Sequence, residues 1–179
     1  MGDVFIERMV KKKFEGKDAL VLVGIVVGIA LCILIALYVG LVLIRFPALG
    51  LLAAVGAGYG GYKLMSMRLL EYEYSLTNGY ITVDKIMNRS SRKRLTSFEC
   101  SSCEEIGEYA KSVERLRSRT FDNRVFAAEY ADFRNSWYMV VNGTKTGRTL
   151  VVFDPDEDLQ EAIKKFIPRS LRFEVFGRS

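Results

Sequence analysis

One uninterrupted apolar segment, Ala19 to Ile44, constrains the fold of this chain more than any other feature. It contains no charged, amide, serine or threonine side chain. A helix needs about 20 apolar residues to cross the hydrocarbon core of a bilayer. Only a helix or a closed barrel satisfies its own backbone hydrogen bonds there. The segment therefore predicts a transmembrane helix over 19–44.

A cleavable signal peptide is the competing interpretation of such a segment. Its apolar core covers about 7–15 residues, whereas this one is longer and follows a basic N-terminal segment, 1–18. A second apolar stretch, 46–62, follows a break around Arg45 and Pro47 and ends at Lys63, whose side chain can extend to the membrane surface so that the helix continues to 66. We therefore expect two transmembrane helices, about 19–44 and 46–66, that form a hairpin. A single span followed by a re-entrant or interfacial segment is the alternative.

Small residues recur at four-residue spacing in both apolar stretches, which lets lipid-embedded helices approach closely. Either the two helices of the hairpin pack through this face, or a homo-oligomer does. The expected helix-packing seam consists of Gly24, Gly28, Gly40, Gly50, Ala54 and Gly58.

Basic residues predict the orientation of the hairpin. They are concentrated in 8–17 before the first helix and at Lys63 and Arg68 near the end of the second, with only Arg45 between the helices. An excess of Lys and Arg marks the cytoplasmic side of a membrane. We expect a multi-pass protein of the inner (cytoplasmic) membrane with both termini in the cytoplasm.

The sequence offers little catalytic chemistry. It contains no histidine, which excludes a histidine base and a histidine-ligated metal site. Cys100 and Cys103 form a Cys-x-x-Cys motif, but Glu99 and Glu104-Glu105 beside it work against a low thiol pKa. We expect no catalytic, cofactor-binding or metal-binding residues. Thiol redox chemistry through Cys100 and Cys103, or zinc at a dimer interface, is the alternative.

Residues 67–179 have the pattern of a cytoplasmic, sheet-rich domain. Residues 71–77 alternate in polarity, and Asn78-Gly79 after them is a strong hairpin signal that leads into a return strand, 80–87. Residues 104–124 fit either a helix or a strand followed by a basic loop. The other predicted strands are 92–100, 125–133, 137–141 and 149–153, of which the last two form a second hairpin around Asn142-Gly143 and Gly147.

An amphipathic helix is expected after Asp154-Pro155, with Asp154 as its N-cap and Pro155 in its first turn. Leu159, Ile163 and Phe166 lie on one face of this helix. Residues 171–176 again alternate between apolar and charged side chains, so they either add a strand or dock on a partner.

These motifs resemble bacterial pleckstrin-homology-like (PH-like) domains, and the chain is similar to short bacterial two-span membrane proteins of unknown function that carry such a domain. The resemblance implies an α+β membrane protein, with an N-terminal transmembrane helical hairpin and a small antiparallel β domain closed by a C-terminal amphipathic helix. It implies no activity. The residues that carry it are Glu71-Tyr-Glu-Tyr-Ser-Leu-Thr-Asn-Gly, Ile81-Thr-Val-Asp-Lys, Ser91-Arg-Lys-Arg-Leu and the helix after Phe153-Asp-Pro.

Two basic clusters are candidate contacts for anionic lipid headgroups, where each basic residue near the leaflet contributes about 1 kcal/mol. The alternative is a solvated face of the domain, and no motif for nucleic acid accompanies these residues. The first cluster is Lys85, Arg89, Arg92, Lys93 and Arg94, and the second is Arg115, Arg117, Arg119 and Arg124.

Together these features favour a non-catalytic, membrane-tethered module, integral to the lipid bilayer, that binds a protein partner or the inner membrane surface. An accessory subunit of a membrane transport or secretion complex is the alternative.

Overall fold

The computed structural model describes residues 4–143 and 147–177, and the chain divides into two compact units. One unit is a helical hairpin, Phe14–Leu69. The other, which we call the β domain, comprises Met1–Lys13 and Leu70–Ser179. The hairpin is therefore an insertion in the β domain and does not simply precede it.

The hairpin unit has the two helices that the sequence predicts. Helix α1 spans Gly16–Tyr38 and continues through a π-helical turn, η1, at Val39–Leu43, and α2 spans Pro47–Ser66. Arg45 turns the chain between the helices with a positive φ of 52°. Pro47 then opens α2, where a missing N–H costs no hydrogen bond.

Among the described residues, one helix, Gly16–Leu43, is long and apolar enough to cross a membrane, with a mean hydropathy of 3.3. Length and composition are the only basis for this assignment, and a signal sequence near the N-terminus has the same properties. Several glycines, two tyrosines and Lys63 lower the hydropathy of α2. The helical hairpin is thus confirmed, whereas its two membrane crossings remain a prediction.

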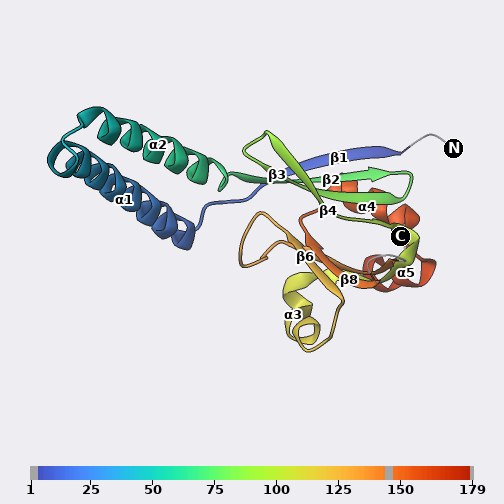
Figure 1. Ribbon diagram of the computed structural model, residues 1–179. Helices are drawn as coiled ribbons and strands as arrows, with labels where there is room; N and C mark the ends of the chain where they lie inside the picture. The colour runs from blue at the N-terminus through green and yellow to red at the C-terminus, as the bar shows by residue number, and fades with distance from the viewer. Residues whose placement is uncertain (1–3, 144–146, 178–179) are drawn as a thin grey trace. The chain divides into compact units, whose positions relative to one another are not determined.

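The first sheet of the β domain, sheet A, contains four antiparallel strands in the order β1-β2-β3-β4 (Figure 1). The predicted hairpin of β2 and β3 is confirmed, and Asn78 and Gly79 in its turn have φ values of 48° and 88°. The strands are β1 Phe5–Lys11, β2 Leu70–Thr77, β3 Tyr80–Met87 and β4 Ser91–Glu99.

Strand β1 corrects the sequence prediction, which treats 1–18 as a segment separate from the domain. Phe5–Lys11 pairs with β2 along its whole length, from Phe5 opposite Thr77 to Lys11 opposite Glu71. Its alternating burial, with Val10 in the core, is the pattern of a half-buried strand.

The second sheet, sheet B, has the strand order β5-β7-β8-β6, and β6 runs parallel to β8. The predicted hairpin of β7 and β8 is confirmed, although residues 144–146 of its turn lie outside the described residues. A short 3-10 turn, η2, at Cys100–Ser102 joins the two sheets. The strands are β5 Cys103–Glu108, β6 Asn123–Ala127, β7 Trp137–Gly143 and β8 Gly147–Phe153.

One sequence prediction for this region needs correction, and at two other places the structure decides between the alternatives. Residues 104–124 contain both a strand, β5, and a helix, α3, at Tyr109–Arg117. The strand predicted at 125–133 ends at Ala127, because the backbone then turns away from the sheet. Residues 171–176 add no strand but belong to helix α5, Arg169–Phe176. Leu171, Val175 and Phe176 pack on the core. Their spacing in the sequence places them on the side of the helix that faces the core.

The predicted C-terminal amphipathic helix is α4, Glu157–Phe166, and it lies against β1 and β2. Its N-cap is Asp156 and not Asp154, because the Asp156 carboxylate accepts a hydrogen bond of 3.0 Å from the Leu159 N–H. Leu159 and Ile163 are buried, as their spacing predicts.

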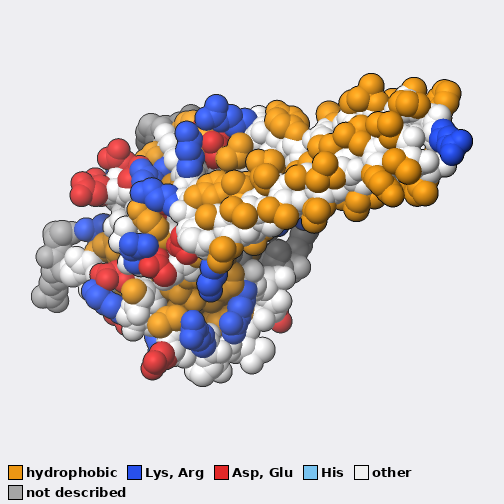
Figure 2. Space-filling model, turned by 90° about the vertical axis from the view of Figure 1, so that its left-hand side faces the viewer, with side chains coloured by type: hydrophobic (Ala, Val, Ile, Leu, Met, Phe, Trp, Pro, Cys, Tyr) orange, Lys and Arg blue, Asp and Glu red, His pale blue; other side chains and the backbone are white. Residues whose placement is uncertain are grey.

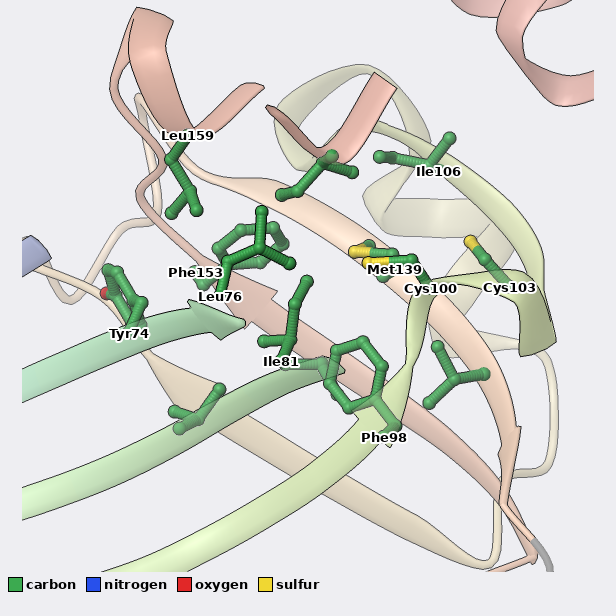
Figure 3. Packing of buried hydrophobic residues seen from close by; sticks show 14 of the residues in the cluster. Tyr74, Leu76, Ile81, Phe98, Cys100, Cys103, Ile106, Met139, Phe153 and Leu159 are labelled. Carbon is green, nitrogen blue, oxygen red and sulfur yellow. The ribbon is translucent and has the colours of Figure 1, made fainter. Parts of the chain in front are cut away.

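The main core lies between the two sheets (Figure 3). Tyr74 and Leu76 of sheet A meet Met139 and Phe153 of sheet B, and Leu159 reaches them from α4. A second, smaller cluster lies on the outer face of sheet B, where α3 covers Tyr138, Val140, Leu150 and Val152. Sheet B is therefore buried on both faces.

Candidate functional site

Both connections to the hairpin leave the β domain at the same end. The Lys12 N–H donates to the Leu70 carbonyl at 3.0 Å, and the Lys13 N–H donates to the Glu129 carbonyl at 2.8 Å. Leu70 also lies opposite Met87, at the turn between β3 and β4. We call this end the rim; it consists of Lys12–Lys13, Leu70, the 87–91 turn and the 128–136 loop.

Buried polar groups attach the 128–136 loop to the core of the β domain. Asp154 accepts hydrogen bonds of 2.5 Å from both the Ser136 hydroxyl and the Glu129 N–H. The hydroxyl of buried Tyr74 donates to the Ala127 carbonyl, just before the loop. Burial raises the pKa of Tyr74, so its hydroxyl stays a donor at every physiological pH. These bonds therefore tie both ends of the loop to the core.

Aromatic side chains gather on the loop and beside it. The Lys13 ammonium lies 4.7 Å from the centre of the Tyr130 ring, and the Arg134 guanidinium lies 4.2 Å from it. The Phe133 ring lies 5.2 Å from that of Phe126, which is 38% exposed. Figure 2 shows a patch of hydrophobic side chains on the β domain that Lys and Arg side chains surround.

Carboxylates neutralise both cations that lie against the Tyr130 ring. Lys13 forms an ion pair of 3.0 Å with Glu129, and Arg134 forms one of 3.1 Å with Asp132. Hydrogen bonds to Tyr130 and Glu129 raise the pKa of Lys13, so it is fully charged at neutral pH. The sequence reasoning missed this group because its members are far apart in the chain, and only the register of β1 brings Lys13 to the loop.

The first predicted basic cluster lies on β3, β4 and the turn between them, but its arginines are already paired. Arg92 forms an ion pair with Glu73 at 2.6 Å, and Arg94 forms one with Asp84 at 3.1 Å. The two carboxylates are buried beneath their guanidinium partners. Burial raises the pKa of Glu73, although the charge of Arg92 opposes the shift.

The other members of this cluster are less enclosed. Arg89 lies 3.5 Å from Glu71 and is mostly exposed. Lys85 and Lys93 lie directly opposite each other on β3 and β4. The paired arginines make this face less positive than the sequence alone suggests.

The second predicted cluster is organised around Glu105. Arg115 and Arg119 both form ion pairs with this carboxylate, and the Tyr138 hydroxyl donates to it at 2.7 Å. Burial alone would raise the pKa of Glu105, but the hydrogen bonds and the two guanidinium charges lower it overall. Arg124 instead donates to the Arg119 carbonyl, and Arg117 lies in the last turn of α3. These contacts hold α3 against sheet B.

Cys100, the first residue of η2, and Cys103, which follows η2, are buried free thiols. Burial raises the pKa of each to about 12, and nearby acidic groups add to the shift. A redox thiol needs an accessible thiolate, so their environment opposes that chemistry. Among the described residues, no three or more Cys, Asp and Glu side chains form a group that could hold a metal ion.

The predicted helix-packing seam is only partly assembled. A Cβ atom on Gly40 would lie 2.5 Å from the Cα atom of Gly50, and Ala54 is buried. Gly24, Gly28 and Gly58 instead have open space where a Cβ atom would be. Gly61, which the prediction omits, packs against Ile29. The two helix backbones therefore approach each other closely at Gly40 and Gly50, near the turn.

Comparisons with known proteins agree with the fold of the β domain. No curated protein and no solved structure matches the chain significantly. The model of one family, described as Bacterial PH-like domain (DUF6106), matches residues 2–173. Because this match covers nearly the whole chain, the protein belongs to that family of bacterial PH-like domains.

Proposed function

We propose that this protein is a non-catalytic module tethered to the inner membrane, where α1 and α2 cross the bilayer and the β domain lies in the cytoplasm. There the domain binds a protein partner or the membrane surface. One observation carries the membrane topology: the hairpin is inserted between β1 and β2, which pair in register.

This pairing bears on the number of crossings. If α1 crossed the bilayer and α2 did not, β1 and β2 would lie on opposite sides of the membrane and could not pair. Cleavage of α1 as part of a signal peptide would remove β1 from sheet A. Two crossings, or none, return the chain to the side where β1 lies. The pairing therefore supports two spans over one.

The surface of the hairpin supports a lipid environment. Leu20 and Leu34 on α1 and Leu51 and Leu52 on α2 are each at least 60% exposed, and Figure 2 shows hydrophobic side chains along the visible face of the hairpin. An apolar surface of this extent marks a membrane or protein contact. Arg45 is the basic residue between the helices, whereas Lys11, Lys12 and Lys13 precede α1, which favours cytoplasmic termini.

The test is a pair of reporter fusions in the full-length chain, one after the C-terminus and one at Arg45. We expect the C-terminal reporter to be cytoplasmic and the Arg45 reporter to be external. A C-terminal reporter outside the cytoplasm would contradict the topology. Co-purification from gently solubilised membranes then tests the binding role, since a stable transport or secretion complex would identify an accessory subunit instead.

A further inference from the structure

The chain between the β domain and the hairpin is short on both sides. Only Lys12–Glu15 separate β1 from α1, and only Met67–Leu69 separate α2 from β2. Four extended residues reach at most roughly 15 Å. If the hairpin crosses a bilayer, as the proposed function states, the rim must therefore lie near the headgroups of that bilayer.

The chemistry of the rim suits this position. Aromatic side chains with a polar end are enriched at the membrane–water interface, and basic side chains extend towards the phosphates. Tyr130 has this character, with Lys13 and Arg134 against its ring. Half-buried Phe133 of the same loop packs against the exposed ring of Phe126. Because Glu129 and Asp132 neutralise Lys13 and Arg134, these two cations contribute little net charge to a contact of the loop.

We propose that the 128–136 loop contacts the lipid headgroups next to the hairpin, with Tyr130 and Phe133 at the level of the interface. The hydrogen bonds from Ser136 and Glu129 to Asp154 fix this loop before it meets the membrane, so the contact requires little ordering of the chain.

The experiment uses the full-length chain in phosphatidylcholine vesicles that carry a quencher at headgroup depth. Tyr130→Trp places a fluorescent ring on the loop. Tyr80→Trp is the matched control, because Tyr80 is 48% exposed and β2 separates it from the rim by about 23 Å at roughly 3.3 Å per residue. The signal of the native Trp137 is subtracted from both.

On binding to vesicles, the tryptophan emission of Tyr130→Trp should shift to shorter wavelength, and the headgroup quencher should reduce its intensity. We expect neither change for Tyr80→Trp. Phe133→Trp should repeat the result if Tyr130→Trp folds poorly. The quenching should be similar in anionic and neutral vesicles and at low and high salt, because the loop cations are paired.

Three outcomes would overturn the inference. The first is that the two variants show equal emission changes, or no change, in vesicles that retain the protein after an alkaline wash. This outcome would contradict the loop contact but leave the membrane tether intact. Quenching that needs anionic lipid and disappears with salt would assign the contact to Lys85, Lys93 and Arg89. Loss of the protein from the vesicles would overturn the membrane tether, and the loop contact with it.

Discussion

Lys11, the last residue of β1, lies opposite Glu71 at the start of β2, and the whole helical hairpin is inserted between these two neighbours. Strand β1 therefore joins sheet A only if both ends of the hairpin return to the same place. Folding of the β domain and the arrangement of the hairpin are coupled through this strand pair.

A disulfide can test the pair in membranes. Glu7 and Ser75 lie opposite each other on β1 and β2, where Cα atoms are about 4.5–5.5 Å apart, a separation that a disulfide spans. We expect Glu7→Cys with Ser75→Cys to cross-link in oxidised native membranes. The control, Glu7→Cys with Thr82→Cys, places the second thiol one strand further away, on β3. Equal cross-linking of both pairs, detected by peptide mass spectrometry, would argue against the register.

The buried hydroxyl of Tyr74 should contribute to stability. It donates to the Ala127 carbonyl and lies 3.4 Å from the Asp154 N–H, inside the core. Tyr74→Phe leaves these groups without that partner, which should lower the free energy of unfolding by about 1–3 kcal/mol. Tyr80→Phe is the control, because its hydroxyl contact with Ser97 is exposed. Thermal unfolding of the detergent-solubilised chain measures both, and equal melting temperatures would contradict the assigned role of Tyr74.

Local patterns in the sequence predict most of the β domain. Asn78-Gly79 predicts a hairpin turn because both residues adopt positive φ readily, and this turn connects β2 and β3. The apolar spacing of Leu159 and Ile163 likewise predicts the buried face of α4. These elements depend on interactions between residues that are close in the chain.

The parts that sequence reasoning misses depend on long-range contacts. The partner of strand β1 lies beyond the hairpin, so no local signal joins the two strands. The residues 171–176 alternate like a strand, but the core accepts one face of a helix there. Asp154 resembles an N-cap in sequence, yet Ser136 and Glu129 occupy its carboxylate.

The thiols of Cys100 and Cys103 should be unreactive in the folded domain. Burial raises the pKa of each from 9.0 to about 12, so both remain protonated at pH 8. Their contribution to stability is complete below pH 9.0 and is lost as the pH rises towards about 12, because the unfolded chain ionises first. In a Cys32→Ala background, Cys100 and Cys103 should therefore be alkylated at pH 8 only to the extent that urea unfolds the chain. Rapid alkylation of the folded chain would instead support the redox alternative.

The contact between Gly40 and Gly50 should control the packing of the hairpin. A Cβ atom on Gly40 would lie 2.5 Å from the Cα and 2.7 Å from the N of Gly50, and neither backbone atom can move aside easily. Overpacking of this kind typically costs about 1–3 kcal/mol, so Gly40→Ala should lower the melting temperature of the hairpin in detergent.

The matched control for this variant is Gly58→Ala in α2, because nothing lies within 4 Å of the added Cβ atom. Alanine also favours a helix over glycine by roughly 0.5–1 kcal/mol, so Gly58→Ala should leave the hairpin as stable as the parent or slightly more stable. Far-UV circular dichroism during heating measures the loss of helix in both variants. If Gly40→Ala and Gly58→Ala have the same melting temperature, the packing of the two helices does not depend on their close approach at Gly40 and Gly50.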